Sequence, residues 1–176
     1  MPKESLPIKL DPFRFADNAI RLHGVLPISQ LQRLCLSLYK DEGEIDVNLT
    51  FGVDEEGLRY VRGHYDTNVV LQCQRCMEPF FYEVIGDFAL GIVSGEKEAE
   101  QLPSRYDPAI VSDGMLNMPE VVEDELIVSL PLVPMHNPKQ CQVKLPLVAG
   151  SDRQSESEKE NPFKVIELLR SKRDPK

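Results

Sequence analysis

Apolar and polar residues alternate between positions 44 and 93, and this pattern constrains the fold of the chain more than any other feature. From Ile45 to Val53 every second residue is apolar, which is the period of a strand with one buried face. Acidic residues followed by glycine at 54–57 indicate a hairpin turn. Residues 58–73 and 80–93 continue as two further strands. Together these segments predict an antiparallel meander.

Other extended segments precede or follow this meander in the sequence. Residues 6–10 and 20–26 alternate in the same way and predict strands, with a turn at 11–12 between them. Residues 106–111 predict an extended edge segment. Within the long strands, Gly63 is a candidate β-bulge and Gly86 a candidate bend.

Three segments have features of helices. Apolar residues recur at helical spacing over 27–39, which predicts a helix with Ser29 as its N-cap and Gly43 as its stop. Asn117 followed by Glu120 resembles a capping box and predicts a helix that runs to about residue 130. Residues 96–101 predict a short charged helix or loop. We therefore expect an α+β fold, an antiparallel β meander or partly closed sheet with a few flanking helices.

The domain organisation follows from composition. Residues 1–149 of the 176 predict a single α+β domain. Residues 150–161 are rich in Ser, Glu, Asp and Lys and predict a flexible linker. Residues 162–176 predict a basic C-terminal helix or tail, whose apolar residues either dock on the sheet or leave the basic ones free to bind. The candidate binding residues there are Lys164, Arg170, Lys172 and Arg173.

The charge of the chain is unevenly distributed around its net value of −9. Residues 41–161 carry nine basic and 24 acidic side chains, whereas both ends are basic. This pattern fits either a solvated acidic surface or an acidic middle that meets a basic partner while the ends contact phosphate. No apolar run approaches the ~20 residues that cross a bilayer, and the first residues lack the layout of a signal peptide. We expect a cytoplasmic protein that does not bind a membrane.

Cys73 and Cys76 are the strongest local chemical signal. Two cysteines separated by two residues suit a metal ion or dithiol redox chemistry. Their setting between strands, without the helix that follows a redox pair, favours a zinc knuckle over redox work. His136 and Cys141 are the candidate third and fourth ligands, although they do not form a second pair of the same spacing. Free thiols in a structural turn are the alternative, and Arg75 between the cysteines is a candidate contact for phosphate or a carboxylate.

No pattern of catalysis accompanies these residues. The chain has no nucleophile elbow, phosphate-binding loop or dinucleotide fingerprint. The acidic residues 123–125 would fan around a helix by about 200° and cannot all face one magnesium ion or substrate. A solvated helix face is the expected role of this cluster. We expect no enzyme activity and no small-molecule substrate.

Ordered motifs along the chain resemble the bacterial YceD proteins, also called large ribosomal RNA subunit accumulation proteins. They are Leu6-Pro-Ile-Lys-Leu-Asp-Pro12, Leu71-Gln-Cys-Gln-Arg-Cys-Met-Glu-Pro-Phe80, Val122-Glu-Asp-Glu-Leu-Ile-Val-Ser-Leu-Pro131 with Val133-Pro-Met-His136 and Cys141, and Asn161-Pro-Phe163. The resemblance covers nearly the whole chain. Some relatives end in an additional cysteine-rich stretch that looks like a zinc site, of which this chain has His136 and Cys141.

The resemblance implies a factor for synthesis, processing or stability of large-subunit (23S) ribosomal RNA. It implies ribosomal RNA or the precursor large subunit as partner, and the acidic middle of the chain adds basic ribosomal proteins as one means of contact. It carries no catalytic residue and no certain cofactor. The competing hypotheses are a thiol–disulfide enzyme and a structural zinc module, both using Cys73 and Cys76.

Overall fold

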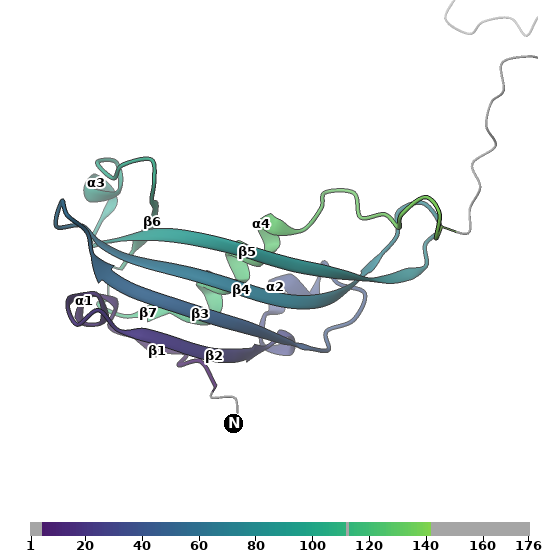
Figure 1. The fold of residues 1–176 in the computed structure, drawn as a ribbon, viewed down its shortest axis with the longest axis horizontal. Helices are drawn as coiled ribbons and strands as arrows, with labels where there is room; N and C mark the ends of the chain where they lie inside the picture. The colour runs from purple at the N-terminus through teal and green to yellow at the C-terminus, as the bar shows by residue number, and fades with distance from the viewer. Residues whose placement is uncertain (1–4, 112, 142–176) are drawn as a thin grey trace, which may run out of the picture. The chain divides into compact units, whose positions relative to one another are not determined.

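A five-stranded sheet with the order β2-β3-β4-β5-β6 forms the centre of the protein (Figure 1). The structure is a computed structural model, and it describes residues 5–111 and 113–141. Residues 142–149, the predicted linker 150–161 and the predicted tail 162–176, with Lys164, Arg170, Lys172 and Arg173, lie outside the described residues.

Four strands in chain order form an antiparallel meander, which consists of the three predicted strands of residues 44–93 and the predicted strand at 20–26. They are β2 (Arg21–Pro27), β3 (Glu44–Val53), β4 (Arg59–Gln72) and β5 (Pro79–Val93), and each pairs antiparallel with the next. At the far edge, β6 (Asp107–Ile110) pairs parallel with β5. The α+β prediction is confirmed, as a mixed sheet that stays open.

Two short strands and five short or medium helical segments complete the described chain. The strands β1 (Lys9–Leu10) and β7 (Leu116–Asn117) form a separate two-stranded sheet. The helical segments are α1 (Pro12–Asp17), the 3-10 turn η1 (Ile28–Gln30), α2 (Gln32–Cys35), α3 (Glu96–Ala99) and α4 (Met118–Ser129).

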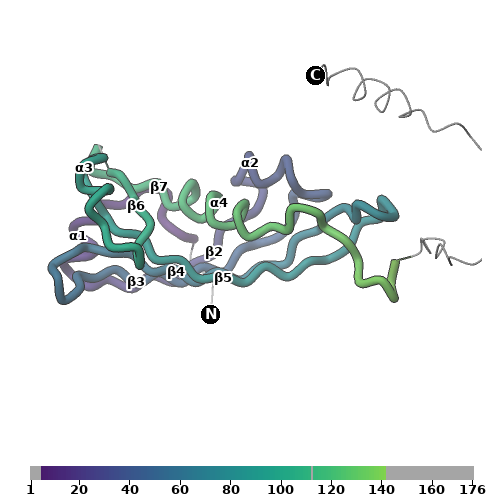
Figure 2. The backbone as a smooth tube through the Cα atoms, turned by 90° about the horizontal axis from the view of Figure 1, so that it is seen from above, coloured from purple at the N-terminus to yellow at the C-terminus, as the bar shows by residue number. Residues whose placement is uncertain are grey.

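The core lies between the sheet and α4. Figure 2 shows α2 and α4 on the same side of the sheet. The alternating residues of β3 point to this side and are at most 1% exposed from Ile45 to Phe51. Val122 and Leu126 of α4 pack against them with no exposed surface, and full burial of such a side chain stabilises the fold by about 1.5–3 kcal/mol. The side chain of Tyr65 in β4 reaches α4, where its hydroxyl hydrogen-bonds Ser129 Oγ at 2.5 Å.

The predicted turn at 11–12 is wrong, because a helix begins there. The Asp11 side chain accepts a hydrogen bond from Arg14 N at 3.0 Å, and Pro12 occupies the first helical turn of α1. An aspartate N-cap followed by proline is a helix-start signal, so the sequence did contain it.

The helix predicted over 27–39 is much shorter than expected. Only η1 and the four-residue α2 form, because Leu31 between them leaves the helical region with φ −97° and ψ 82°. After Cys35 the chain turns toward the sheet, where Tyr39 N donates to Val70 O at 2.8 Å and Lys40 pairs with Val70. Pairing with β4 therefore replaces the last turns of the predicted helix.

Gly63 forms no bulge, and the strand pairing runs regularly through Gly86. Gly63 lies opposite Phe88 and Gly86 lies opposite Tyr65. A Cβ on Gly63 would lie 2.1 Å from the Phe88 ring, and one on Gly86 would lie 2.3 Å from Tyr65 Oη. Each glycine therefore makes room for the aromatic ring across the strand pair.

Candidate metal centre

The turn between β4 and β5 holds Cys73 and Cys76. Cys73 N donates to Glu78 O at 3.0 Å, and Met77 N donates to Cys73 O at 2.8 Å, which closes the turn. Met77 adopts a left-handed conformation with φ +64°, which is unfavourable for a residue with a side chain. The turn holds the sulfurs of Cys73 and Cys76 within 4.8 Å of each other.

The loop after α4 brings His136 and Cys141 to this turn. Pro134 O accepts a hydrogen bond from Gln74 N at 2.8 Å, and His136 N donates to Cys73 Sγ at 3.4 Å. In the local turn that follows, Cys141 N donates to Asn137 O at 3.2 Å, and this turn places Cys141 beside the other three residues. Figure 1 shows this loop reaching the end of the β4–β5 hairpin.

The four predicted ligand residues converge in a cluster that could bind a metal ion. One donor atom from each of Cys73, Cys76, His136 and Cys141 lies within 4.8 Å of the other three. Cys76 Sγ and His136 Nδ1 are 3.2 Å apart. Zinc–thiolate bonds of about 2.3 Å in a tetrahedron place two sulfurs about 3.8 Å apart, so the donors need only small movements. Three thiols and one imidazole also match the donor types of structural zinc sites.

The two cysteines of the turn differ in their electrostatic environment. Burial raises the pKa of the Cys73 thiol, but N–H groups of His136, Cys76 and Arg75 point at its sulfur and bring the pKa well below its ordinary value. The pKa of the Cys76 thiol is raised, first by burial and then by the neighbouring sulfurs of Cys73 and Cys141. N–H groups directed at a sulfur favour a thiolate, the form that binds metal.

Access to the sulfurs argues against a dithiol redox centre. Cys73, which has the lower thiol pKa, has no exposed surface. A disulfide substrate must reach the attacking thiolate. Among the described residues, the cysteines lie between two strands and do not begin a helix.

Arg75, the other predicted contact residue of the turn, is half-buried. One guanidinium nitrogen donates to Met135 Sδ at 3.6 Å. Within residues 5–111 and 113–141 this guanidinium forms no ion pair, so it is free to meet a carboxylate or a phosphate.

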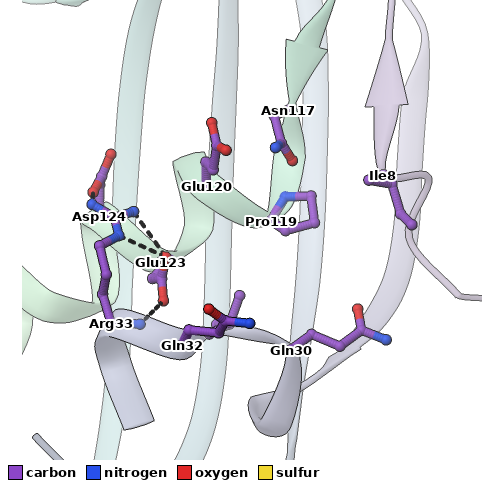
Figure 3. A pocket seen from close by; sticks show the side chains of 10 residues that line it. Ile8, Gln30, Gln32, Arg33, Asn117, Pro119, Glu120, Glu123 and Asp124 are labelled. Carbon is purple, nitrogen blue, oxygen red and sulfur yellow. Dashed lines mark hydrogen bonds and ion pairs between the residues drawn. The ribbon is translucent and has the colours of Figure 1, made fainter. Parts of the chain in front are cut away.

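A second arrangement of side chains joins α4 to α2, and the sequence did not predict it (Figure 3). The Glu123 carboxylate accepts hydrogen bonds from Arg33 N at 2.7 Å and Leu34 N at 3.1 Å, and an Arg33 side-chain nitrogen lies 2.8 Å from it. Asp124 binds the same guanidinium at 2.6 Å. The prediction of a solvated helix face is therefore wrong for Glu123, whose side chain is 7% exposed.

Glu123 caps the N-terminus of α2 from another helix. Leu31, at the N-cap position, provides no side-chain hydrogen bond, and the first N–H groups of a helix otherwise lack partners. Burial alone would raise the pKa of Glu123, but the N–H groups of Leu34 and Arg33 and the guanidinium outweigh it and lower the pKa. This carboxylate is therefore a structural charge. Beside it, an open pocket of about 620 Å³ lies between α2 and the start of α4.

The fold and the site define the class of protein: an open α+β sheet whose longest hairpin meets a distant loop in a Cys₃His cluster. None of the helices among the described residues is long and apolar enough to span a membrane.

The comparisons with known proteins identify the family. The family described as large ribosomal RNA subunit accumulation protein YceD matches residues 61–170, which include all four candidate ligands. A relative with the same description from Haemophilus influenzae is 34% identical over 174 residues, 98% of this chain and 100% of the relative. No solved structure matches. The chain belongs to the YceD family.

Proposed function

We propose that this protein is a cytoplasmic, non-enzymatic factor in ribosome biogenesis, supporting synthesis, processing or stability of large-subunit (23S) ribosomal RNA. The observation that carries the proposal is the 34% identity, over the full length of the relative, to a large ribosomal RNA subunit accumulation protein. Its partner is the ribosomal RNA or the precursor large subunit, contacted in part through basic ribosomal proteins. The acidic net charge of −9 supports contact through proteins over contact with the RNA backbone.

The Cys₃His cluster in this proposal holds a structural zinc ion. Four protein donors leave no open position for substrate or water, which is the arrangement of structural rather than catalytic zinc. Cys73 and Cys76 come from the hairpin turn, and His136 and Cys141 come from the loop after α4. The ion would fasten these two segments together.

The biological proposal is tested by deleting the gene and measuring the ratio of large- to small-subunit ribosomal RNA. We expect the ratio to fall and to recover when the wild-type gene is returned. A ratio that stays normal during both fast growth and cold stress would contradict the proposal.

The zinc proposal is tested by elemental analysis of protein purified without chelators. We expect about one zinc per chain, and loss of that zinc in Cys141→Ser. Cys35→Ser is the matched control, because its thiol donates to Ile28 O in η1, away from the cluster. Zinc far below one per chain in the wild type would refute the proposal, and rapid turnover of a disulfide substrate by that protein would favour the thiol–disulfide alternative.

A further inference from the structure

The outward surface of α4 and the loop after it combine carboxylates with large exposed apolar side chains. Residues four apart in a helix lie on one face, so Glu120, Asp124 and Val128 form one stripe. Figure 3 shows the first two projecting from α4. Val128 is 84% exposed, and Leu132, in the loop that follows the end of the helix at Ser129, is fully exposed. Apolar side chains left in water beside a helix commonly mark a contact surface.

A groove of about 350 Å³ between β6 and α4 adjoins this stripe. Its acidic lining residues are Asp107, Glu120, Asp124 and Glu125, and no described lysine or arginine lines it. Ile110, 47% exposed, adds an apolar side chain to the wall. The groove and the stripe together are called the α4 surface below.

The carboxylates of the α4 surface are not neutralised by their neighbours. Asp124 binds Arg33, but Asp107, Glu120 and Glu125 form no ion pair among the described residues. Burial raises the pKa of Glu125, and the charges of Asp107 and Asp124 raise it further. A cation brought into the groove would relieve this repulsion.

We propose that the α4 surface docks a lysine- or arginine-bearing amphipathic segment of a protein partner. This inference rests on the proposed function and identifies the chemistry of one partner. The basic groups would meet the groove carboxylates, and the apolar side of the segment would cover Val128 and Leu132.

Charge decides against RNA, anionic lipid and a second copy of the chain as occupants. RNA and anionic lipid would bring phosphates against three unpaired carboxylates. A second copy in a two-fold contact would place the same acidic patch on both sides of the interface. A basic amphipathic protein segment can both meet the carboxylates of the groove and cover the exposed apolar side chains.

Binding of defined probes to the full-length, zinc-supplemented protein tests the inference. The probe is a short synthetic amphipathic peptide of leucine and lysine. The comparison probes are its leucine–glutamate counterpart, a scrambled leucine–lysine peptide without an apolar face, and single-stranded RNA, measured by fluorescence anisotropy at low and physiological salt. We expect the amphipathic leucine–lysine peptide to bind most tightly.

Matched variants locate the binding. The double variant Glu120→Gln with Glu125→Gln should weaken binding of the amphipathic leucine–lysine peptide by about tenfold or more. Val128→Ser should weaken this binding as well. The controls lie on strand positions outside the α4 surface: Glu83→Gln, and Phe81→Ser at a side chain that is 81% exposed. These controls should change affinity by less than about twofold.

Four results would overturn the inference. They are equal losses of affinity in the control variants, tighter binding of RNA or of the leucine–glutamate peptide, equal binding of the scrambled peptide, and self-association of the protein that Val128→Ser abolishes.

The gene-deletion strain separates this inference from the proposed function. If the wild type restores the ribosomal RNA ratio and the α4-surface variants restore it equally well, only the inference fails. If deletion leaves the ratio normal, the proposed function fails and the peptide comparison still decides the chemistry of the surface.

Discussion

Replacing Glu123 by alanine should destabilise the protein more than any other removal of a single charge from α4. Its carboxylate is the only described partner of the Arg33 and Leu34 N–H groups at the start of α2. Alanine leaves both donors without an acceptor, and Leu31 has no side-chain group to replace it.

The magnitude follows from how deeply each partner lies. Leu34 is fully buried, and its hydrogen bond to Glu123 is 3.1 Å long. A buried donor left unsatisfied costs about 1–3 kcal/mol. Arg33 has a side chain that is 53% exposed and keeps Asp124 as a partner, so its guanidinium is resolvated at little cost. With both N–H groups counted, we expect Glu123→Ala to lower the free energy of unfolding by about 3 kcal/mol.

Two milder variants separate the loss of the hydrogen-bond acceptor from the loss of the charge. Glu123→Gln keeps an oxygen for the two N–H groups but turns an amide N–H₂ toward the Arg33 guanidinium, so we expect an intermediate cost. Asp124→Asn removes a charge from the same ion-pair network at a side chain that is 62% exposed. It should cost far less than Glu123→Ala.

The pH dependence of stability has a defined sign. The folded-state pKa of Glu123 lies below its ordinary value of 4.5, so the stability it contributes is fully present above about pH 4.5 and is lost as pH falls through the folded-state pKa. Glutamine does not titrate. The difference in stability between the wild type and Glu123→Gln should therefore be constant near neutral pH and shrink in acid.

Urea unfolding followed by circular dichroism, at constant zinc and at several pH values, measures these quantities. The explanation is refuted if Glu123→Ala costs less than about 1 kcal/mol, or no more than Asp124→Asn. A stability difference between wild type and Glu123→Gln that grows in acid would refute the assigned charge state.

Three further substitutions test packing and backbone geometry by the same unfolding measurement. Gly63→Ala should lower the free energy of unfolding by about 1–3 kcal/mol, because its Cβ would lie 2.1 Å from the Phe88 ring. An unchanged unfolding midpoint would show that the ring moves freely. Met77→Gly should stabilise the protein by about 1 kcal/mol, since φ is +64° there and the residue is 57% exposed. A loss of stability would mean that packing of the Met77 side chain contributes more than the backbone strain costs. Tyr65→Phe should cost about 1 kcal/mol through the lost hydrogen bond to Ser129, and no change would show that the bond contributes nothing.

The central strands could be predicted because their signal is local. Each of β3, β4 and β5 begins and ends within about two residues of the range that the alternation indicated. The parallel pairing of β6 could not be predicted, because it depends on how the chain after β5 returns to the sheet edge. The same limit applies after Cys35, where pairing of Lys40 with Val70 overrides helical spacing.

The sequence around Glu123 contains a signal that this carboxylate is buried. In the helix it lies beside Val122 and four residues after Pro119, on the same side as Leu126. Helical periodicity therefore placed this carboxylate on the buried face, where a charge needs partners. The sequence could not show that Arg33 supplies them, since 90 residues separate the two along the chain.

The Cys₃His cluster was predictable in composition but not in position, and the strand register explains its position. Pairing between β3 and β4 extends only to Asp66, whereas β4 and β5 remain paired to Gln72 and Pro79. The hairpin therefore projects beyond β3 as two strands, braced on the β4 side at Val70 by Lys40. Two strands alone are marginally stable in water. The loop after α4 meets this projecting end, so a zinc ion at the proposed site would anchor the least supported part of the sheet to the polypeptide that leaves the core helix.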